Sequence, residues 1–303
     1  MNHLVHYTSC PVCKNKSLQQ VLEVNDFTVS QELFPVVECN DCGLRFTQNI
    51  PCETAIQRYY QSTNYISHSN SKKGIINRLY HVTRIFTMMS KEALVKNATG
   101  RAVGMLLDVG SGTGSFVHTM SVAGWNVVGV EPDPAARAFA LKKYNSDIYP
   151  AEELFMLPDA TYDVITMWHV LEHVHRLDDY IAQLKKVLAP GGKIIIAVPN
   201  YTSKDATVYQ SNWAAYDVPR HLYHFSPQSM RKLMEQHGLQ VISTKPMWLD
   251  SFYVSMLSEK NIKGSMIKAI WNGIKSNINA LFHKEECSSL VYVIGVPVVD
   301  ENS

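Results

Sequence analysis

Short apolar runs alternate with longer amphipathic segments over most of this chain. The runs that predict strands cover residues 105–109, 126–131, 162–167 and the stretch that begins at 194. The segments with apolar side chains at helical spacing cover residues 114–123, 134–144 and 177–188. Strands that alternate with helices in this way predict βαβ units, and therefore an α/β fold with a mostly parallel sheet.

The segment after residue 200 is expected to complete this sheet. A helix is predicted over 228–237, with Ser226 as its N-cap. Two more strands are predicted over 240–243 and 289–294, and a helical insert around 262–285 lies between them.

The first hundred residues follow a different pattern. Residues 1–50 contain short strand-like stretches, whereas residues 51–102 have a helical pattern that a polar stretch at 67–74 interrupts. This second segment is expected to be a lid or linker. Three of its tyrosines either belong to a cover that excludes water or pack on the core: Tyr59, Tyr60 and Tyr65.

Composition and charge narrow the class of protein. Of the 303 residues, 46% are hydrophobic and 18% charged, which predicts a globular protein with a sizeable core. The formal net charge of +1 gives no reason to expect bulk capture of nucleic acid or of an anionic membrane. No signal peptide is visible at the N-terminus, and no apolar run approaches the ~20 residues of a membrane span. We therefore expect a cytoplasmic location, without a membrane partner.

Four of the six cysteines form two CxxC pairs, separated by 25 residues. The pairs are Cys10 with Cys13 and Cys39 with Cys42. In a chain without a secretion signal, paired CxxC units favour metal binding over disulfides, and four thiolates suit a structural Zn²⁺ ion. A fifty-residue segment has little core, and zinc would add on the order of 10 kcal/mol to its stability. We predict a zinc-ribbon-like module over 1–50; incidental or redox cysteines are the alternative.

A glycine-rich turn follows the strand at 105–109. Gly110, Gly112 and Gly114 have G-x-G-x-G spacing, which departs from the dinucleotide fingerprint G-x-G-x-x-G/A. Asp108 lies two positions before the first glycine, where its carboxylate suits the ammonium group of a cofactor with an amino acid tail. Glu131 closes the next strand, about 20 residues downstream, where nucleotide-binding α/β folds place a ribose ligand.

These residues resemble the first two motifs of the class I S-adenosylmethionine-dependent methyltransferases, over roughly residues 103–245. The resemblance implies a Rossmann-like sheet of seven strands sandwiched by helices, with one antiparallel strand at the end. It also implies that residues 103–303 form the catalytic domain. The cofactor-binding residues that it implies are Asp108, Gly110, Ser111, Gly112, Gly114, Glu131, Pro132, Glu152, Trp168 and His169.

Two histidine clusters are candidates for the acceptor side. His221 and His224 lie in a loop after the fifth strand, where acceptors bind in such folds, and histidine is the natural base near neutral pH. We predict His221 as the first candidate base and His224 as the second, with Arg220 or Tyr223 contacting substrate. Packing of the loop onto the sheet is the alternative use of both histidines.

The second cluster is His169, Glu172 and His173. It resembles the Glu-x-x-Glu-His metal site of some quinone O-methyltransferases and small-RNA 2′-O-methyltransferases, with His169 in place of the first Glu. These positions share one face of a helix start and could hold a divalent ion. The alternative is that these three residues contact the cofactor and pack the start of the helix.

The resulting hypothesis is an enzyme that methylates oxygen or carbon of a small molecule, such as a sugar or a quinone-like metabolite. Methylation of an exocyclic amine in nucleic acid usually needs an Asn/Asp-Pro-Pro-aromatic segment, and Met167-Trp168-His169-Val170 stands at that place. An RNA or protein acceptor and an inactive cofactor-binding scaffold are the alternatives. The sequence does not define the oligomeric state.

Overall fold

A computed structural model of the chain describes residues 4–60 and 75–297, with only the backbone over 75–86. Tyr65 and the polar stretch at 67–74 lie outside the described residues. The strands are β1 (Leu4–Val5), β2 (Leu18–Asn25), β3 (Leu33–Cys39), β4 (Arg45–Thr47), β5 (Ile50–Pro51), β6 (Met105–Val109), β7 (Asn126–Val130), β8 (Ile148–Tyr149), β9 (Tyr162–Trp168), β10 (Leu188–Pro199), β11 (Tyr223–His224), β12 (Gln240–Pro246) and β13 (Ser289–Gly295). The α-helices are α2 (Ile75–Thr99), α3 (Ser115–Val122), α4 (Pro134–Tyr144), α5 (Leu177–Val187), α6 (Lys204–Tyr209), α7 (Pro227–Gln236), α8 (Asp250–Asn261) and α9 (Met266–Phe282).

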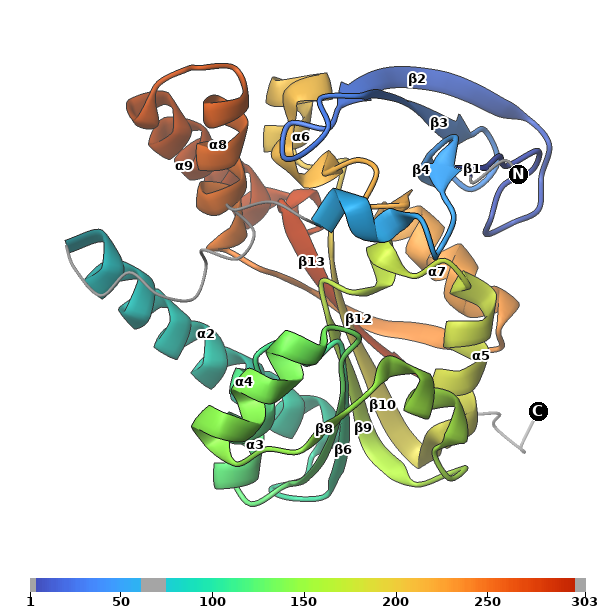
Figure 1. Cartoon of the computed structure of the whole chain (residues 1–303), viewed down its shortest axis with the longest axis vertical. Helices are drawn as coiled ribbons and strands as arrows, with labels where there is room; N and C mark the ends of the chain where they lie inside the picture. Colours follow the sequence, from blue (N-terminus) through green and yellow to red (C-terminus); the bar gives the residue numbers. More distant parts are fainter. Residues whose placement is uncertain (1–3, 61–74, 298–303) are drawn as a thin grey trace.

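The central sheet has seven strands in the order β12-β13-β10-β9-β6-β7-β8. All are parallel except β13, the last in the chain, which inserts antiparallel between β10 and β12. Helices lie on both sides of this sheet (Figure 1). The predicted α/β class and the seven-stranded, mostly parallel sheet are confirmed. The predicted helical insert corresponds to α9, whereas α8, which precedes it, was not predicted.

Two apolar cores cover the two faces of the central sheet. On one face, α2 and α3 contribute Val95, Phe116 and Met120. On the other face, α5 and α7 pack together with side chains from the N-terminal segment, such as Phe46 and Ile50. Because the second core is continuous with the N-terminal segment, burial of apolar surface holds that segment against the α/β domain that contains the central sheet.

The N-terminal segment does not form a sheet from its own residues alone. Its four-stranded sheet has the order β11-β4-β3-β2, and β11 comes from residues far along the chain. Tyr223 pairs with Phe46 and His224 with Arg45. The N-terminal module therefore extends beyond the predicted boundary at residue 50. In space it also includes β11, from the loop in which the catalytic base was predicted. In Figure 1 this sheet lies beyond the end of the central sheet that carries α6.

Helix termini show why several elements begin where they do. Asp133 caps α4 by accepting a hydrogen bond from the amide of Ala135, and Pro134 occupies the first turn. Ser226 caps α7 in a reciprocal pair with Ser229, again with proline in the first turn. The second cap fixes the point where the β11 loop ends, which the sequence predicted.

Candidate active site

The glycine-rich turn joins β6 to α3 and contains three residues with positive φ. Gly110 has φ of 75°, and a Cβ there would lie 2.3 Å from a methyl carbon of Val170. Gly114 is equally enclosed, since its Cβ would lie 2.6 Å from that of Ala140. Gly112 has φ of 52° and nothing within 4 Å of a Cβ position. The outer glycines are therefore required by packing, whereas Gly112 leaves open space beside bare backbone, where a ligand can approach.

Glu131, at the end of β7, faces this open backbone. Its Oε2 accepts a hydrogen bond from the amide of Gly112 at 2.8 Å, and its Oε1 accepts one from the amide of Asp133 at 2.9 Å. Each carboxylate oxygen can accept a second hydrogen bond. Burial raises the pKa of Glu131, although both amides oppose the shift. The carboxylate is thus fixed in place with acceptor capacity left, as a ribose ligand requires.

Asp108 is buried at the end of β6, with 1% of its surface exposed. Thr166 donates a hydrogen bond of 2.6 Å to its Oδ1. Burial raises the pKa of Asp108 to about 6, despite the charge of nearby Lys91. Lys91 therefore compensates the negative charge of Asp108 only in part, and a cationic group of a ligand beside this carboxylate would compensate the rest.

The other predicted cofactor residues occupy the edges of the same region. Ser111 donates to the backbone oxygen of Asp108 at 2.9 Å and so closes the turn. Pro132 and Glu152 are exposed beyond β7 and β8. The indole nitrogen of Trp168 is buried and has no hydrogen-bond partner among the described residues.

His169 directly follows β9 and has a strained backbone with φ of 57°. Its Nε2 lies 3.1 Å from Oδ2 of Asp250, the first residue of α8. Its Nδ1 lies 3.5 Å from Oε1 of Glu172. Burial disfavours the charged ring, but the two carboxylates outweigh it and raise the pKa of His169 to about 10. His169 is therefore a cation that ties α8 to the end of β9.

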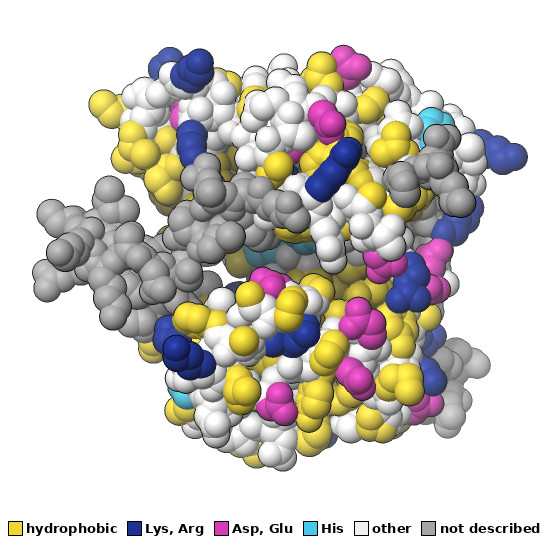
Figure 2. Space-filling model, viewed as in Figure 1, with side chains coloured by type: hydrophobic (Ala, Val, Ile, Leu, Met, Phe, Trp, Pro, Cys, Tyr) yellow, Lys and Arg dark blue, Asp and Glu magenta, His cyan; other side chains and the backbone are white. Residues whose placement is uncertain are grey.

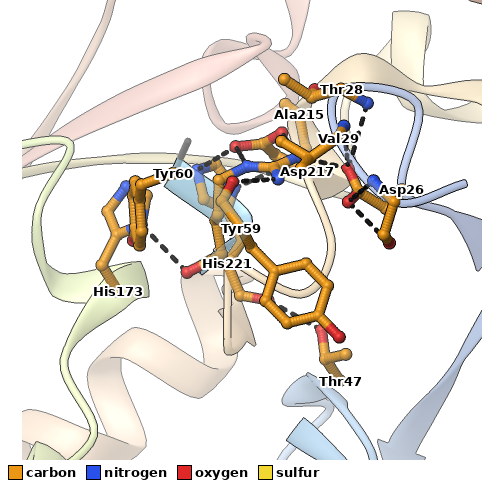
Figure 3. Close-up of polar contacts among 12 residues, drawn as sticks. Asp26, Thr28, Val29, Thr47, Tyr59, Tyr60, His173, Ala215, Asp217 and His221 are labelled. Atoms are coloured by element: carbon orange, nitrogen blue, oxygen red, sulfur yellow. Dashed lines mark hydrogen bonds and ion pairs between the residues drawn. The ribbon is translucent and has the colours of Figure 1, made fainter. Parts of the chain in front are cut away.

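His173 and His221 meet edge to face, with ring centroids 4.6 Å apart. Nδ1 of His173 lies 2.9 Å from the backbone oxygen of Arg220, and Nδ1 of His221 lies 2.8 Å from that of Ala215. Both Nδ1 atoms must carry hydrogen to donate to these carbonyls, which leaves each Nε2 as the acceptor of a neutral ring. These contacts appear in Figure 3, where Tyr60 also approaches His173.

Glu172 completes this cluster. Its side chain is 1% exposed, and neither carboxylate oxygen has a hydrogen-bond partner among the described residues. One ligand atom from each of Glu172, His173 and His221 lies within 4.8 Å of the other two. His169 faces Oε1 of Glu172 at 3.5 Å and compensates part of its charge, and the remaining acceptor capacity of the buried carboxylate suits a cation or a proton between the three groups. The sequence predicted His169 as the third member; His169 instead bridges Asp250 and Glu172, and His221 lies at the third position of the cluster.

A buried ion-pair network holds the loop that carries His221. Nη2 of Arg220 donates to Asp217 at 2.6 Å and to Asp26, in the N-terminal segment, at 2.9 Å. Its Nη1 donates to the backbone oxygen of Tyr59 at 2.8 Å. Figure 3 shows how Asp26 and Asp217 approach one another across this cluster. Because Arg220 is only 1% exposed and fully engaged, it positions the loop, and the predicted substrate contact has no support from the geometry.

Tyr223 and His224 form β11, an edge strand of the N-terminal sheet, and both side chains are buried. Nε2 of His224 lies 3.1 Å from Oγ1 of Thr47, and burial holds the pKa of His224 well below its usual range. The hydroxyl of Tyr223 lies 3.1 Å from that of Tyr7. Thr47 also donates to the backbone oxygen of His221 at 2.7 Å. These contacts support packing as the role of His224, and they leave His221 as the stronger candidate base.

Sequence reasoning missed three carboxylates of this site: Asp26, Asp217 and Asp250. Each lies in a different part of the chain, and no motif marks its partner. Asp217 lies in the same loop as His221, three residues before Arg220, and is the one that the sequence could have indicated.

The four paired cysteines meet at one place, as predicted. The sulfurs of Cys10 and Cys42 are 3.5 Å apart, and those of Cys13 and Cys39 are 3.4 Å apart. A tetrahedral zinc site with Zn–S bonds of about 2.3 Å needs sulfurs roughly 3.8 Å apart, so the four thiols fit the ion. The contact between the two sulfurs lowers the pKa of Cys42 and raises that of Cys10, so the pair favours one thiolate, the form that binds zinc.

The space-filling view shows a cleft at the surface of the molecule. A cleft runs between the upper part of the molecule, which includes the N-terminal sheet and α8–α9, and the lower part, which includes α3 and α4 (Figure 2). Histidine surface is visible inside this cleft. The cofactor side and the acceptor side therefore face a common opening.

The chain is similar to known methyltransferases. A family model described as a methyltransferase domain matches residues 84–244. A ubiquinone biosynthesis O-methyltransferase of Photobacterium profundum is 34% identical over 106 residues, which are 33% of this chain and 45% of that relative. A demethylmenaquinone methyltransferase of Tropheryma whipplei is 22% identical over 50% of this chain and 69% of its own length. The match thus spans less than half of the first relative.

One solved structure has the same fold over most of the chain. The magnesium protoporphyrin IX methyltransferase of Synechocystis PCC 6803, with bound S-adenosylhomocysteine, is superposed with a TM-score of 0.53 at 16% identity. The superposition covers 80% of this chain and 98% of that one. The arrangement of the central sheet is therefore that of a known methyltransferase fold.

Proposed function

This chain belongs to the family of methyltransferase domains, and on that basis we propose that it methylates a small molecule with S-adenosylmethionine as the donor. The observation that carries the proposal is the open backbone at Gly112 beside the fixed carboxylate of Glu131. A ribose and an amino acid tail can be bound there by Glu131 and Asp108. One relative is named for ubiquinone biosynthesis and another for demethylmenaquinone, and these names support an oxygen or carbon atom of a quinone-like ring as the acceptor.

The histidine cluster supplies the acceptor side of the reaction. The bound cofactor would supply an electrophilic methyl group on a sulfonium. Nε2 of His221 would take the proton from the acceptor hydroxyl as the new bond to the methyl carbon forms and the bond to sulfur breaks. Asp217, whose Oδ2 lies 4.0 Å from that Nε2, stabilises the resulting imidazolium.

The same cluster supports a second use. Glu172, His173 and His221 could hold a divalent cation through one carboxylate oxygen and two Nε2 atoms, and the backbone hydrogen bonds of both Nδ1 atoms are the usual support for such ligands. A cation there would orient the acceptor oxygen and favour its deprotonation. The carboxylate of Glu172, which lacks a hydrogen bond, favours this reading.

His221→Ala tests the acceptor side. Turnover should fall by about tenfold or more, with cofactor affinity unchanged, because the substitution removes Nε2 without touching the glycine turn. The measurement pairs a labelled-methyl assay on quinone precursors, sugars and RNA with calorimetry of cofactor binding. Addition of Mg²⁺ or Mn²⁺ to protein that keeps the zinc at its four cysteines separates the two uses of the cluster, since only a cation held by Glu172, His173 and His221 would make turnover depend on that addition. Unchanged turnover would remove His221 from the mechanism.

Loss of cofactor binding in Glu131→Ala and Gly112→Val tests the donor side. Wild-type protein that fails to bind S-adenosylmethionine would instead indicate an inactive scaffold.

We also propose that Cys10, Cys13, Cys39 and Cys42 hold a structural zinc ion, because their sulfurs have nearly the spacing that the ion requires. Elemental analysis of freshly purified protein should find about one zinc per chain.

A further inference from the structure

Helix α9 has its apolar face turned outward. The side chains on its buried face are small: Ala269, Gly273, Ser276 and Ala280. Its large apolar side chains are between 48% and 80% exposed: Met266, Ile267, Ile270, Trp271, Ile278, Leu281 and Phe282. At 100° per residue, these exposed positions form one continuous stripe. A surface helix normally turns such a stripe toward the core, so α9 has the orientation of a helix whose partner lies outside the chain.

Hydrogen bonds fix this orientation. Ser276 donates to Asp205 of α6 at 2.8 Å, and Asn272 donates to the hydroxyl of Tyr209 at 2.9 Å. Ser251 of α8 donates to Asn277 at 2.8 Å. Rotation of α9 to bury the apolar stripe would break all three contacts and leave buried polar atoms without partners. The outward apolar face is therefore a stable feature of the fold.

The charges within α9 have one sign, and acidic residues flank it beyond its ends at Glu259, Glu285 and Glu286. The segment from Lys260 to Lys284 contains five lysines and no aspartate or glutamate, in a chain whose net charge is only +1. All five lysines are exposed. Lys268 and Lys275 lie along one edge of the apolar stripe, and Nζ of Lys275 is 5.4 Å from the centroid of the Trp271 ring. An apolar stripe with Trp and Phe and a lysine edge is the pattern of a helix that lies in a membrane interface.

We propose that α9 docks on the surface of an anionic lipid bilayer, with its apolar stripe in the headgroup region and its lysines on the lipid phosphates. Charge decides between this occupant and a second copy of the chain, because α9 itself contains Lys268 and Lys275 and no aspartate or glutamate, so a second α9 would meet it with like charges. In Figure 2, hydrophobic surface with adjacent Lys and Arg surface gathers where Figure 1 places α8 and α9. No helix in the described residues is long and apolar enough to cross a membrane, so the docking is to one face only.

Docking would place the active site beside the bilayer. Asp250, the first residue of α8, pairs with His169 at the end of β9, and α8 packs directly on α9. This consequence rests on the proposed function: the acceptor would then be a lipid-borne ring that reaches the cleft from the membrane. The sequence predicted no membrane partner because the net charge is near zero, but the local charge of residues 260–284 is what a bilayer meets.

Vesicle flotation with the full-length protein tests the docking directly. The wild type should float with phosphatidylglycerol-containing vesicles, bind far less to pure phosphatidylcholine, and dissociate at high salt. Trp271→Ser with Phe282→Ser should weaken binding by about tenfold or more, and Lys268→Glu with Lys275→Glu by at least about tenfold. All four side chains are exposed, so these variants keep the packed face of α9 intact.

Val122→Ser is the matched control, because Val122 is 75% exposed at the end of α3 and should not affect flotation. Wild-type protein that stays with the aqueous phase, or α9 variants that float as well as the wild type, would overturn the proposal. Sedimentation showing a dimer that Trp271→Ser with Phe282→Ser dissolves would assign the stripe to a second copy instead. Cofactor binding by calorimetry should be unchanged in every variant, so failure of docking is distinguishable from failure of the methyltransferase assignment.

Discussion

The two sides of the candidate active site are assembled in different ways. The cofactor side, from Asp108 to Glu131, lies within one β-α-β unit and is fixed by local hydrogen bonds and by close packing at Gly110. The acceptor side depends on the β11 loop, whose strand pairs with β4 and whose Arg220 pairs with Asp26. A change in the N-terminal module should therefore disturb the acceptor side and leave cofactor binding intact.

The largest effect is expected from the cysteine cluster. Cys10→Ser with Cys39→Ser should abolish zinc binding and lower methyl transfer by more than about a hundredfold, because structural zinc contributes on the order of 10 kcal/mol to such a module. Cofactor affinity by calorimetry should change by less than about twofold. Cys52→Ser is the control, since Cys52 lies outside the cluster. Simultaneous loss of cofactor binding would show that the two sides are not independent.

The next effect concerns the buried ion pair. Arg220→Met should lower the free energy of unfolding by about 3–5 kcal/mol, because it leaves the fully buried Asp26 and the partly exposed Asp217 without their cation. Urea denaturation measures the change. Arg58→Met breaks an exposed pair with Glu32 and should lower stability by less than about 1 kcal/mol. Similar values for both variants would mean that the network does not hold the loop.

Two glycines of the cofactor turn give a smaller and sharper contrast. Gly110→Ala should lower the free energy of unfolding by about 2–3 kcal/mol, because its Cβ would overlap Val170 at a positive φ. Gly112→Ala has the same kind of backbone strain but open space, so it should lower stability by only about 1 kcal/mol. Thermal unfolding without cofactor measures both.

The same variants separate packing from ligand contact. Calorimetry should show that Gly112→Ala weakens S-adenosylmethionine binding by about tenfold, because its Cβ would occupy the space left for the ligand. Binding to Gly112→Ala as tight as to the wild type would place the cofactor elsewhere.

The difference between the cofactor side and the acceptor side also explains which contacts the sequence could predict. The strand, the glycine turn and Glu131 are close in the chain, so their spacing alone predicts their relation, and the structure brings them together. The four cysteines were predicted because one ion needs all of them. The contacts of His221 with residues 47 and 217 and the pairing of His169 with Asp250 join distant segments. No local pattern encodes such contacts, because tertiary packing alone decides them.

For α9, the sequence predicted the helix, but only the structure shows which face of it turns outward. Its apolar spacing predicted a helix correctly, but a sequence cannot say which face of an insert meets the core. The small side chains of Ala269, Gly273 and Ala280 decide this, since they allow close approach to α8: a Cβ on Gly273 would lie 2.6 Å from the Phe252 ring.

The smallest predicted effect is a pH dependence of cofactor binding that originates at Asp108. Burial raises the pKa of Asp108 to about 6 in the folded protein, so the stability that this group contributes is fully present below its unfolded pKa and is lost as pH rises through about 6. A cofactor ammonium reverses this balance because it binds the ionised carboxylate. Affinity for S-adenosylmethionine should therefore fall by about tenfold from about pH 7 to about pH 5. Asp108→Asn, which can still accept the hydrogen bond of Thr166, should bind more weakly at neutral pH and without that pH dependence. An Asn variant whose affinity still falls over this range would show that Asp108 is not the titrating group and would make Glu131, whose pKa burial also raises, the next candidate.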